Sequence, residues 1–182
     1  MSSASVETRI DPKKSALLII DVQRALFSRP TPIYNAEQLL SNINSLIEMW
    51  RRNKGLIIFL QHSNNKMLIK GTSGWELHSE LDRKSSDITL DKLHGNAFEN
   101  TNLKDILESK GIEKVVVTGL VTHGCVRATC IGAHHLGYRV SLVEDGHSNY
   151  SKDAEKKIGE WNQKLAVQGV ELISTERLIH SD

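Results

Sequence analysis

Cys125 has the clearest capacity for chemistry in this sequence. It stands in TGLVTHGCVRATC (118–130), directly after an apolar run and where a helix is expected to begin. In the first turn of a helix, free backbone N–H groups and the positive end of the helix dipole favour a thiolate, the nucleophilic form of cysteine. A free cysteine is also often a small buried residue, so its position alone leaves both interpretations open.

Two charged residues stand at comparable positions. Asp21 ends the apolar run SALLIID (15–21), and Lys92 ends ITLDK (88–92). A carboxylate at the end of a buried strand is partly desolvated, which raises its pKa and makes it a base for the thiol proton. A lysine beside both would orient Asp21 and favour the thiolate. Taken singly, such an aspartate often caps the next turn, and a lone lysine is usually a solvated surface charge.

Short apolar runs alternate with amphipathic segments along most of the chain. The apolar runs are typical of strands buried on both faces of a parallel sheet, and they cover residues 15–21, 56–62, 113–119, 139–145 and 170–175, with a further short strand at 88–92. The amphipathic segments have the apolar spacing and end signals of helices, and they cover residues 35–55, 101–111, 124–138 and 151–169. This alternation predicts the α/β class: a three-layer, Rossmann-like α/β/α fold with a central, mostly parallel sheet.

Such a sheet gathers functional groups at the carboxyl ends of its strands. Asp21 and Lys92 end two strands and Cys125 follows a third, so we expect the three side chains to meet in one crevice at this edge. The sequence disfavours a nucleotide-binding Rossmann domain, because no Gly-x-Gly-x-x-Gly follows the first strand.

The overall composition limits the class of protein. A length of 182 residues suits a single domain, 1–182, and a net charge of +1 gives no bulk attraction to nucleic acid or to an anionic membrane. The N-terminus lacks the apolar region of a signal peptide, and no apolar run reaches the roughly 20 residues of a membrane span. The two cysteines, Cys125 and Cys130, lie five residues apart on different faces of the expected helix, which disfavours a disulfide and makes Cys130 a core residue. We therefore expect a reduced, cytoplasmic protein.

Four ordered segments carry a resemblance to a known family. They are ALLIIDVQRALF with Asp21 and Gln23, KGTSGWELHSEL, DITLDKLHGNAFENTNL with Lys92, and VTGLVTHGCVRATCIGAHHLGY with Cys125. Together they resemble the isochorismatase-like cysteine hydrolases, the superfamily that includes nicotinamidases and N-carbamoylsarcosine amidases. The likeness runs nearly from end to end.

The resemblance implies a catalytic triad of Asp21, Lys92 and Cys125. It also implies a non-proline cis peptide bond between Leu120 and Val121, and an oxyanion hole formed by the backbone amides of Val121 and Cys125. In the implied mechanism the thiolate attacks an amide-type carbonyl, and water then hydrolyses the thioester while the aspartate moves the protons. Relatives of this kind are usually homo-dimers or homo-tetramers, so we expect one of these assemblies.

One part of the family pattern differs. Nicotinamidases of this superfamily often bind a metal through an Asp-x-His pair and a further histidine after the second strand. Here FLQHSNNKM (59–67) supplies His62 but no carboxylate, and His78 and His94 lack the spacing of metal ligands. We therefore expect no metal and no other cofactor, and nicotinamide becomes a weaker candidate substrate. His62 is expected to pack near the pocket or to bond a neighbouring segment.

Five residues in the expected loops are candidates to line a substrate pocket. They are Phe27, Trp75, His94, Thr122 and His123. Ordinary packing is the alternative for each of them, and His123 could equally face solvent.

The sequence thus predicts a cysteine-dependent hydrolase that cleaves a C–N amide-type bond of a small molecule, such as an amide or a ureido compound. Thioester or other acyl hydrolysis by the same triad is an alternative, and a non-catalytic oligomeric scaffold is an alternative of another class. The presence of all three triad residues argues against a scaffold. Cys125 also argues against vinyl-ether hydrolysis, because isochorismatases proper lack this cysteine. The substrate itself is not identified by the sequence.

Overall fold

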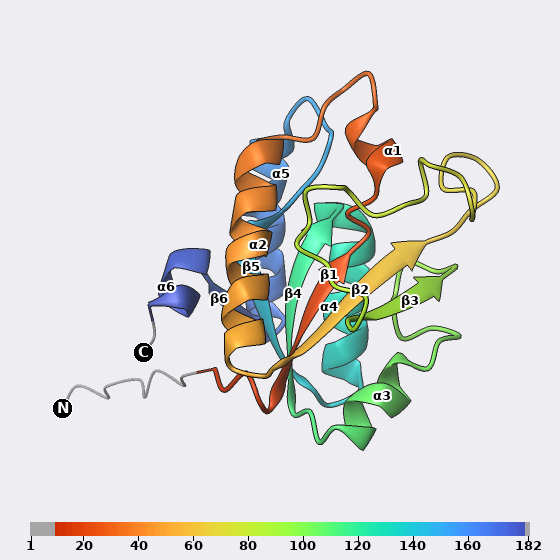
Figure 1. Cartoon of the computed structure of the whole chain (residues 1–182). Coiled ribbons are helices and arrows are strands. Elements are labelled where there is room, and N and C mark those ends of the chain that lie inside the picture. Colours follow the sequence, from red (N-terminus) through yellow and green to blue (C-terminus); the bar gives the residue numbers. More distant parts are fainter. Residues whose placement is uncertain (1–9, 181–182) are drawn as a thin grey trace.

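A six-stranded sheet runs through the centre of the protein, in the order β3-β2-β1-β4-β5-β6 (Figure 1). The computed structural model describes residues 10–180, so the expectations for the N-terminal segment 1–9 lie outside the described residues. The strands are β1 (Ser15–Ile20), β2 (Leu56–His62), β3 (Ile88–Lys92), β4 (Lys114–Leu120), β5 (Arg139–Ser148) and β6 (Glu171–Ile173). Every neighbouring pair is parallel, which confirms the predicted sheet.

Helices cover both faces of the sheet (Figure 1). They are α1 (Arg24–Phe27), α2 (Ala36–Arg52), α3 (Leu103–Ser109), α4 (Arg127–His135), α5 (Ala154–Val167) and α6 (Thr175–Ile179), with a π-helical turn, η1 (Thr122–Val126), directly before α4. Within residues 10–180, none of these helices combines the length and the apolarity that crossing a membrane requires.

The central strand β1 explains why both faces of the sheet must be covered. Leu17 and Ile19 belong to the core cluster that contains the buried residues of α2 and α6. Leu18 and Ile20 point to the opposite face and join the cluster that contains buried residues of α3, α4 and α5. All four side chains are fully buried, as expected for a strand of a parallel sheet between two helical layers.

Two features differ from the expected elements. The helix predicted over 124–138 is divided, because Gly124 has φ −108° and ψ −113°, and α4 begins only at Arg127. The short helices α1 and α6 were not expected, since four or five residues are too few for a periodic pattern.

Gly119 allows β4 to approach β1 just before the segment that carries Cys125. Its φ is +113°, in the region that favours glycine, and the register between β4 and β5 shifts between Val117 and Gly119. A Cβ atom at Gly119 would collide with the backbone of Ile20. A side chain at this position would therefore separate the two strands that lead into the candidate site.

The polar segment 63–87 forms a long connection between β2 and β3. The side-chain oxygen of Asn64 accepts hydrogen bonds from the backbone amides of residues 66, 67 and 68, which orders its first turn. An isolated antiparallel bridge joins Gln23 to Leu77. These contacts hold the segment beside the carboxyl ends of β1 and β2.

Candidate active site

The carboxyl ends of three neighbouring strands bring together an aspartate, a histidine and a lysine. Asp21 directly follows β1, His62 ends β2 and Lys92 ends β3. His62 and Lys92 are partners in the β2–β3 register. The backbone N–H of Asp21 donates to the carbonyl of Leu60 at 2.9 Å, which fixes the end of β1 against β2. Parallel pairing thus gathers all three residues at one edge of the sheet.

Asp21 has a left-handed backbone conformation, with φ +52°. Aspartate is one of the few residues other than glycine that adopt this region, at a cost of about 1–2 kcal/mol. The conformation belongs to a tight turn, in which the Gln23 N–H donates to the Asp21 carbonyl at 2.8 Å. Strain of this kind is often found at functional sites, where surrounding contacts hold the residue in place.

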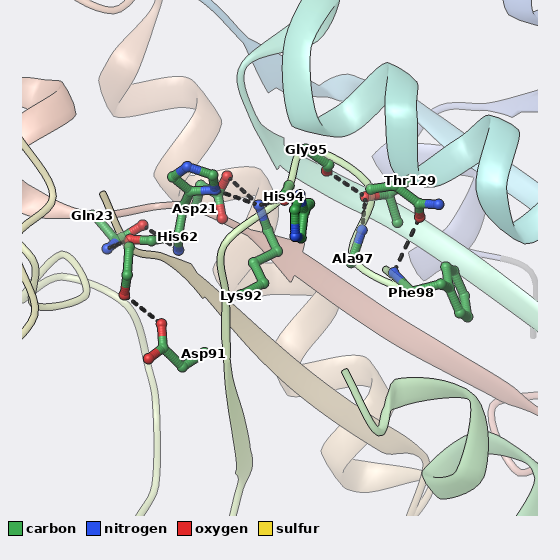
Figure 2. Close-up of polar contacts among 12 residues, drawn as sticks. Asp21, Gln23, His62, Asp91, Lys92, His94, Gly95, Ala97, Phe98 and Thr129 are labelled. Carbon is green, nitrogen blue, oxygen red and sulfur yellow. Dashed lines mark hydrogen bonds and ion pairs between the residues drawn. The ribbon is translucent and has the colours of Figure 1, made fainter. Parts of the chain in front are cut away.

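The ammonium group of Lys92 is completely buried and has a partner for each of its three N–H donors. It lies 2.9 Å from Asp21 Oδ2, 3.2 Å from His62 Nδ1 and 3.2 Å from the backbone carbonyl oxygen of His94. Figure 2 shows these groups pointing toward one another from separate segments. Because an ammonium only donates, His62 must present an unprotonated Nδ1 to it.

Cys125 joins this cluster from the other side. It lies in η1, is partly buried, and its Sγ lies within 4.8 Å of a carboxylate oxygen of Asp21 and a ring nitrogen of His62. The peptide bond between Leu120 and Val121, which precedes η1, is cis. The structure therefore brings together Asp21, Lys92 and Cys125, the three residues that the sequence singled out.

The pKa of the Cys125 thiol is raised to about 12. Burial is the main cause, and the Asp21 carboxylate adds to it, while Lys92 acts in the opposite direction with less effect. The expectation that this position favours a thiolate is therefore wrong for the resting protein. Cys125 precedes α4, and the ammonium of Lys92 is paired with Asp21. In the resting protein, Cys125 is therefore a neutral thiol.

Asp21 has the environment of a base. Burial raises the pKa of its carboxyl above the ordinary value and outweighs the opposite effects of Lys92, Cys125 and His62. Its Oδ2 accepts from Lys92, whereas Oδ1 is buried and has no N–H or O–H donor among the described residues. The thiol of Cys125 is the further side chain that interacts with this carboxylate by hydrogen bonding. A carboxylate oxygen next to a neutral thiol is an arrangement for proton transfer.

The same cluster does not fit a metal ion. Asp21, His62 and Cys125 offer ligand atoms within 4.8 Å of one another, which is close enough for a shared ion. The ammonium of Lys92, however, lies 2.9 Å from Asp21 Oδ2 and 3.2 Å from His62 Nδ1. A divalent cation in this place would be repelled by this neighbouring positive charge.

Gln23 fixes the end of β2 behind the cluster. Its side chain donates to the His62 carbonyl at 3.0 Å and to the Trp75 carbonyl at 2.7 Å, and it accepts from the His62 N–H at 2.9 Å. Gln61 donates a second bond to the Trp75 carbonyl at 3.1 Å. These buried amides tie the long segment 63–87 to the strand ends, and so they orient His62.

The loop after Lys92 is held against α4, the helix that follows Cys125. The Ala97 N–H donates to Thr129 Oγ1 at 3.1 Å, and the same hydroxyl donates to the Gly95 carbonyl at 3.3 Å (Figure 2). Thr129 lies in α4, four residues after Cys125. This contact couples the position of Lys92 to the helix that carries the cysteine loop.

Three of the five expected pocket residues, Trp75 and His94 in loops and Phe27 at the end of α1, contact neighbouring residues of the protein. The indole N–H of Trp75 donates to Ser63 Oγ at 2.8 Å. The ring of Phe27 lies 4.4 Å from that of His78, measured between centroids. His94 contributes its carbonyl to Lys92, while its ring contacts Asn100 Nδ2 at 3.2 Å.

The other two expected pocket residues have different surroundings. The side chain of Thr122 is turned inward and is only 1% exposed, with its hydroxyl 2.9 Å from His147 Nδ1, so Thr122 does not line an open pocket. His123 is partly buried, and burial together with Lys157 and Arg127 lowers its pKa. Its ring therefore lies near the start of α5.

The sheet is parallel and is covered by helices on both faces, and a carboxylate, an ammonium and a thiol lie at its carboxyl edge. This combination is typical of the class of α/β/α hydrolases that carry a cysteine in the site. The family model described as the isochorismatase domain matches residues 15–176 of this sequence, and the chain belongs to the isochorismatase family.

Curated relatives and a solved structure agree with this assignment. Streptothricin hydrolase of Streptomyces noursei is 30% identical over 147 residues, which is 80% of this chain and 53% of that protein, so the match spans about half of its length. Ureidoacrylate amidohydrolase RutB of Variovorax paradoxus is 27% identical over 186 residues, covering 81% of this chain and 74% of that protein. A crystal structure of an isochorismatase family protein superposes with a TM-score of 0.84 at 30% identity, over 89% of this chain and 99% of that chain.

Proposed function

We propose that this protein is a cysteine-dependent hydrolase that cleaves a C–N amide-type bond of a small molecule through a thioester intermediate. The observation that carries the proposal is the cluster itself. Lys92 Nζ lies 2.9 Å from Asp21 Oδ2, and atoms of Asp21, His62 and Cys125 lie within 4.8 Å of one another. A base, a cation and a thiol at these separations are the groups that acyl transfer to sulfur requires.

In the first half of the reaction, the carboxylate of Asp21 takes the proton of the Cys125 thiol as the sulfur attacks the carbonyl carbon. A C–S bond forms, and the carbonyl oxygen becomes an oxyanion. Asp21 then gives the proton to the leaving nitrogen, the C–N bond breaks, and an amine or ammonia departs. The raised pKa of Asp21 favours the first transfer, because the base is stronger than an exposed carboxylate.

In the second half, Asp21 takes a proton from water, and the resulting hydroxide adds to the thioester carbon. The C–S bond breaks, the thiolate recovers the proton from Asp21, and the carboxylic acid is released. The ammonium of Lys92 stays buried beside Asp21 throughout, so it orients the carboxylate and stabilises its charge. His62 supports Lys92 from β2.

The backbone amides of Val121 and Cys125 are the proposed hydrogen-bond donors to the oxyanion. The carbonyl of Val121 accepts from the N–H of Gly124 at 2.9 Å and from that of Val126 at 3.4 Å, which closes the loop around the cysteine. A fixed loop of this kind supports donors whose direction does not change during the reaction. Each donor is expected to contribute about 2.7–4 kcal/mol to lowering the barrier.

The proposed substrates are small amides and ureido compounds. The similarity to a ureidoacrylate amidohydrolase supports this class. The poor fit of the cluster to a metal supports a substrate that is bound without metal coordination. We further propose a cytoplasmic homo-dimer or homo-tetramer, which size-exclusion chromatography with light scattering would test.

A substrate panel with a matched control tests the proposal. Purified protein is incubated with nicotinamide, N-carbamoylglycine, ureidoacrylate and simple primary amides, and the release of ammonia is measured. The same panel is run with C125A and with C130A. We expect ammonia release from at least one compound with the wild-type protein and C130A, and none with C125A.

Two results would contradict the proposal. Turnover by C125A equal to that of the wild type would remove the cysteine from the chemistry. Hydrolysis of p-nitrophenyl thioacetate without hydrolysis of any amide would replace the amide class by thioester hydrolysis with the same residues.

A further inference from the structure

A chain of buried hydrogen bonds leads from α5 to the loop that carries Cys125. His147, in β5, lies with Nε2 2.8 Å from Asn162 Oδ1 and with Nδ1 2.9 Å from Thr122 Oγ1. Asn149 Nδ2 lies 3.4 Å from the same Thr122 oxygen. The side chains of Thr122, His147 and Asn149 are all buried, at 1%, 3% and 0% exposure. Because these side chains are buried away from water, their hydrogen-bond partners fix their orientation.

The direction of the bonds follows from the amide at the α5 end. Asn162 Nδ2 donates to the carbonyl of Glu144 at 3.3 Å, so Asn162 Oδ1 is the atom that faces His147. An amide oxygen only accepts, which requires a proton on His147 Nε2. The neutral ring then has a lone pair at Nδ1, and the hydroxyl of Thr122 must donate to it.

The amide at the other end is consistent with this direction. Asn149 Oδ1 accepts the backbone N–H of Ser151 at 3.0 Å, so Asn149 turns its NH₂ group toward Thr122. Thr122 Oγ1 therefore accepts from Asn149, which leaves its own hydrogen available to His147 Nδ1. The Asn162 end fixes the direction of the bonds, because the second lone pair of the threonine oxygen leaves the direction open at the Asn149 end.

This chain of bonds reaches the reactive loop at a defined place. Thr122 is the first residue of η1, directly follows Val121, and precedes Cys125 by three residues. The amides of Val121 and Cys125 are the proposed oxyanion donors. A change in the position of Thr122 therefore moves both donors and the sulfur together.

We propose that His147, held as its Nε2–H tautomer by Asn162, is a positioning residue that fixes the cysteine loop through Thr122. The proposal rests on the proposed function only in treating Cys125 as the reactive group. Burial lowers the pKa of His147 to about 4, and the opposite effects of Asn162 and the Asp145 carboxylate are smaller. The ring is therefore neutral at neutral pH, and its proton on Nε2 leaves the lone pair of Nδ1 facing Thr122.

The first test compares two buried threonines. T122V removes the hydroxyl that reaches His147. T118V removes the hydroxyl of Thr118 in β4, which donates to the carbonyl of Leu18 in β1 at 2.9 Å. Both side chains are essentially unexposed, so both variants should lose a similar amount of stability in urea unfolding. The rate of Cys125 alkylation by iodoacetamide at pH 8 is then measured by peptide mass spectrometry.

We expect T122V to be alkylated about tenfold faster than the wild type, because a released loop admits water and lowers the thiol pKa by about one unit. T118V should keep the wild-type rate, and T122S, which restores the hydroxyl, should return to within about threefold of it. Equal rates for T122V and the wild type, or equal acceleration in T118V, would overturn the proposal.

The second test removes the hydrogen bonds of His147 to Asn162 and to Thr122 one at a time. H147N keeps an acceptor near the Nδ1 position and loses Asn162, whereas H147Q keeps a donor near the Nε2 position and loses Thr122. We expect the alkylation rate to rise more in H147Q than in H147N. The opposite order would show that Thr122 does not transmit the effect.

The tautomer is observed directly by long-range ¹H–¹⁵N NMR of the wild-type imidazoles at pH 7. The expected pattern for His147 is a protonated Nε2 and an unprotonated Nδ1, and a protonated Nδ1 would overturn the proposal. Neither the alkylation rates nor the NMR spectrum depends on turnover. If the amide panel gives no hydrolysis, the proposed function fails while these measurements still decide the role of His147.

Discussion

Two lysine–carboxylate pairs lie at opposite ends of the same sheet. At the carboxyl edge, Lys92 Nζ is 2.9 Å from Asp21 Oδ2. At the amino edge, Lys114 Nζ is 2.6 Å from Glu171 Oε2, and the same carboxylate oxygen accepts from Ser141 Oγ at 2.7 Å. Lys114, Ser141 and Glu171 belong to β4, β5 and β6, so this pair links three adjacent strands.

The surroundings of the two carboxylates differ in a way that affects their pKa. The side chain of Asp21 is 4% exposed and that of Glu171 is 42% exposed. Burial raises the pKa of Asp21, whereas the pKa of Glu171 is lowered, because bonds from Lys114 and Ser141 outweigh its weaker desolvation. A well-satisfied carboxylate is a poor base. A lysine–carboxylate pair is thus a structural tie at one end of the sheet and the proposed proton acceptor with its cation at the other.

The largest effect is expected from removal of the sulfur at the carboxyl edge. C125A should lower turnover at least about 10⁴-fold, because the nucleophile itself is lost. The free energy of unfolding should change by less than about 1 kcal/mol, since Cys125 is only partly buried. Ammonia release and urea unfolding measure the two quantities. C130A, on the buried face of α4, should keep its activity and lose stability instead.

The next effect compares the two carboxylates. D21N should lower turnover about 10³-fold and destabilise the fold by about 3–5 kcal/mol, because the buried ammonium of Lys92 loses its countercharge. E171Q should keep full turnover and cost less stability than D21N, since the side chain of Glu171 is 42% exposed although that of Lys114 is only 7% exposed.

A double variant tests whether D21N loses stability because Lys92 is left unpaired and loses turnover because the carboxylate is missing. D21N/K92Q removes both buried charges, so it should recover most of the stability that D21N loses while remaining inactive. Recovery of turnover in the double variant would mean that Asp21 is not the base.

The third prediction concerns the pH dependence of turnover. Asp21 must be ionised to accept the thiol proton, so turnover falls as the pH falls through its pKa. Lys92 lowers that pKa, and K92Q should therefore move the acidic limb of the pH–rate profile to higher pH. K114Q, at the amino edge, should leave the limb unchanged. A profile of K92Q that coincides with the wild type would separate Lys92 from the titration of Asp21.

The smallest effect concerns stability in acid. Because the folded pKa of Glu171 is below 4.5, its bonds contribute stability above that pH and lose it as the pH falls. The wild type should therefore be more stable than E171Q at pH 6, and the difference should shrink as the pH falls below 4.5. Urea unfolding at several pH values measures it. A difference that grows in acid would contradict the sign of the shift.

Four of the six strands could be predicted from the sequence to within one residue, whereas β5 extends three residues beyond the predicted 139–145 and β6 is three residues shorter than the predicted 170–175. The run SALLIID exceeds β1 by one residue, because buried parallel strands are short continuous apolar runs. The run ITLDK coincides with β3, although this edge strand is only partly buried. The meeting of Asp21, Lys92 and Cys125 also followed from the sequence, since parallel strands place their carboxyl ends at one edge.

Other parts of the site depend on contacts between distant residues. The π-helical turn at Cys125 arises from the backbone of Gly124, which no periodic pattern reveals. The raised pKa of the thiol depends on burial by several segments, so sequence position alone indicated the opposite direction. His62 stands at a strand end and could have been included on that signal. The contact of His147 with Thr122, 25 residues away, had no signal in the sequence.

The uncharged sulfur of Cys125 affects how readily the protein is oxidised. Hydrogen peroxide reacts with thiolates to give sulfenic acid, and a thiol with a pKa of about 12 has almost no thiolate at neutral pH. The resting protein should therefore survive peroxide that inactivates enzymes with permanently ionised cysteines. In the proposed mechanism the sulfur becomes a strong nucleophile only as its proton passes to Asp21 during attack on a bound substrate.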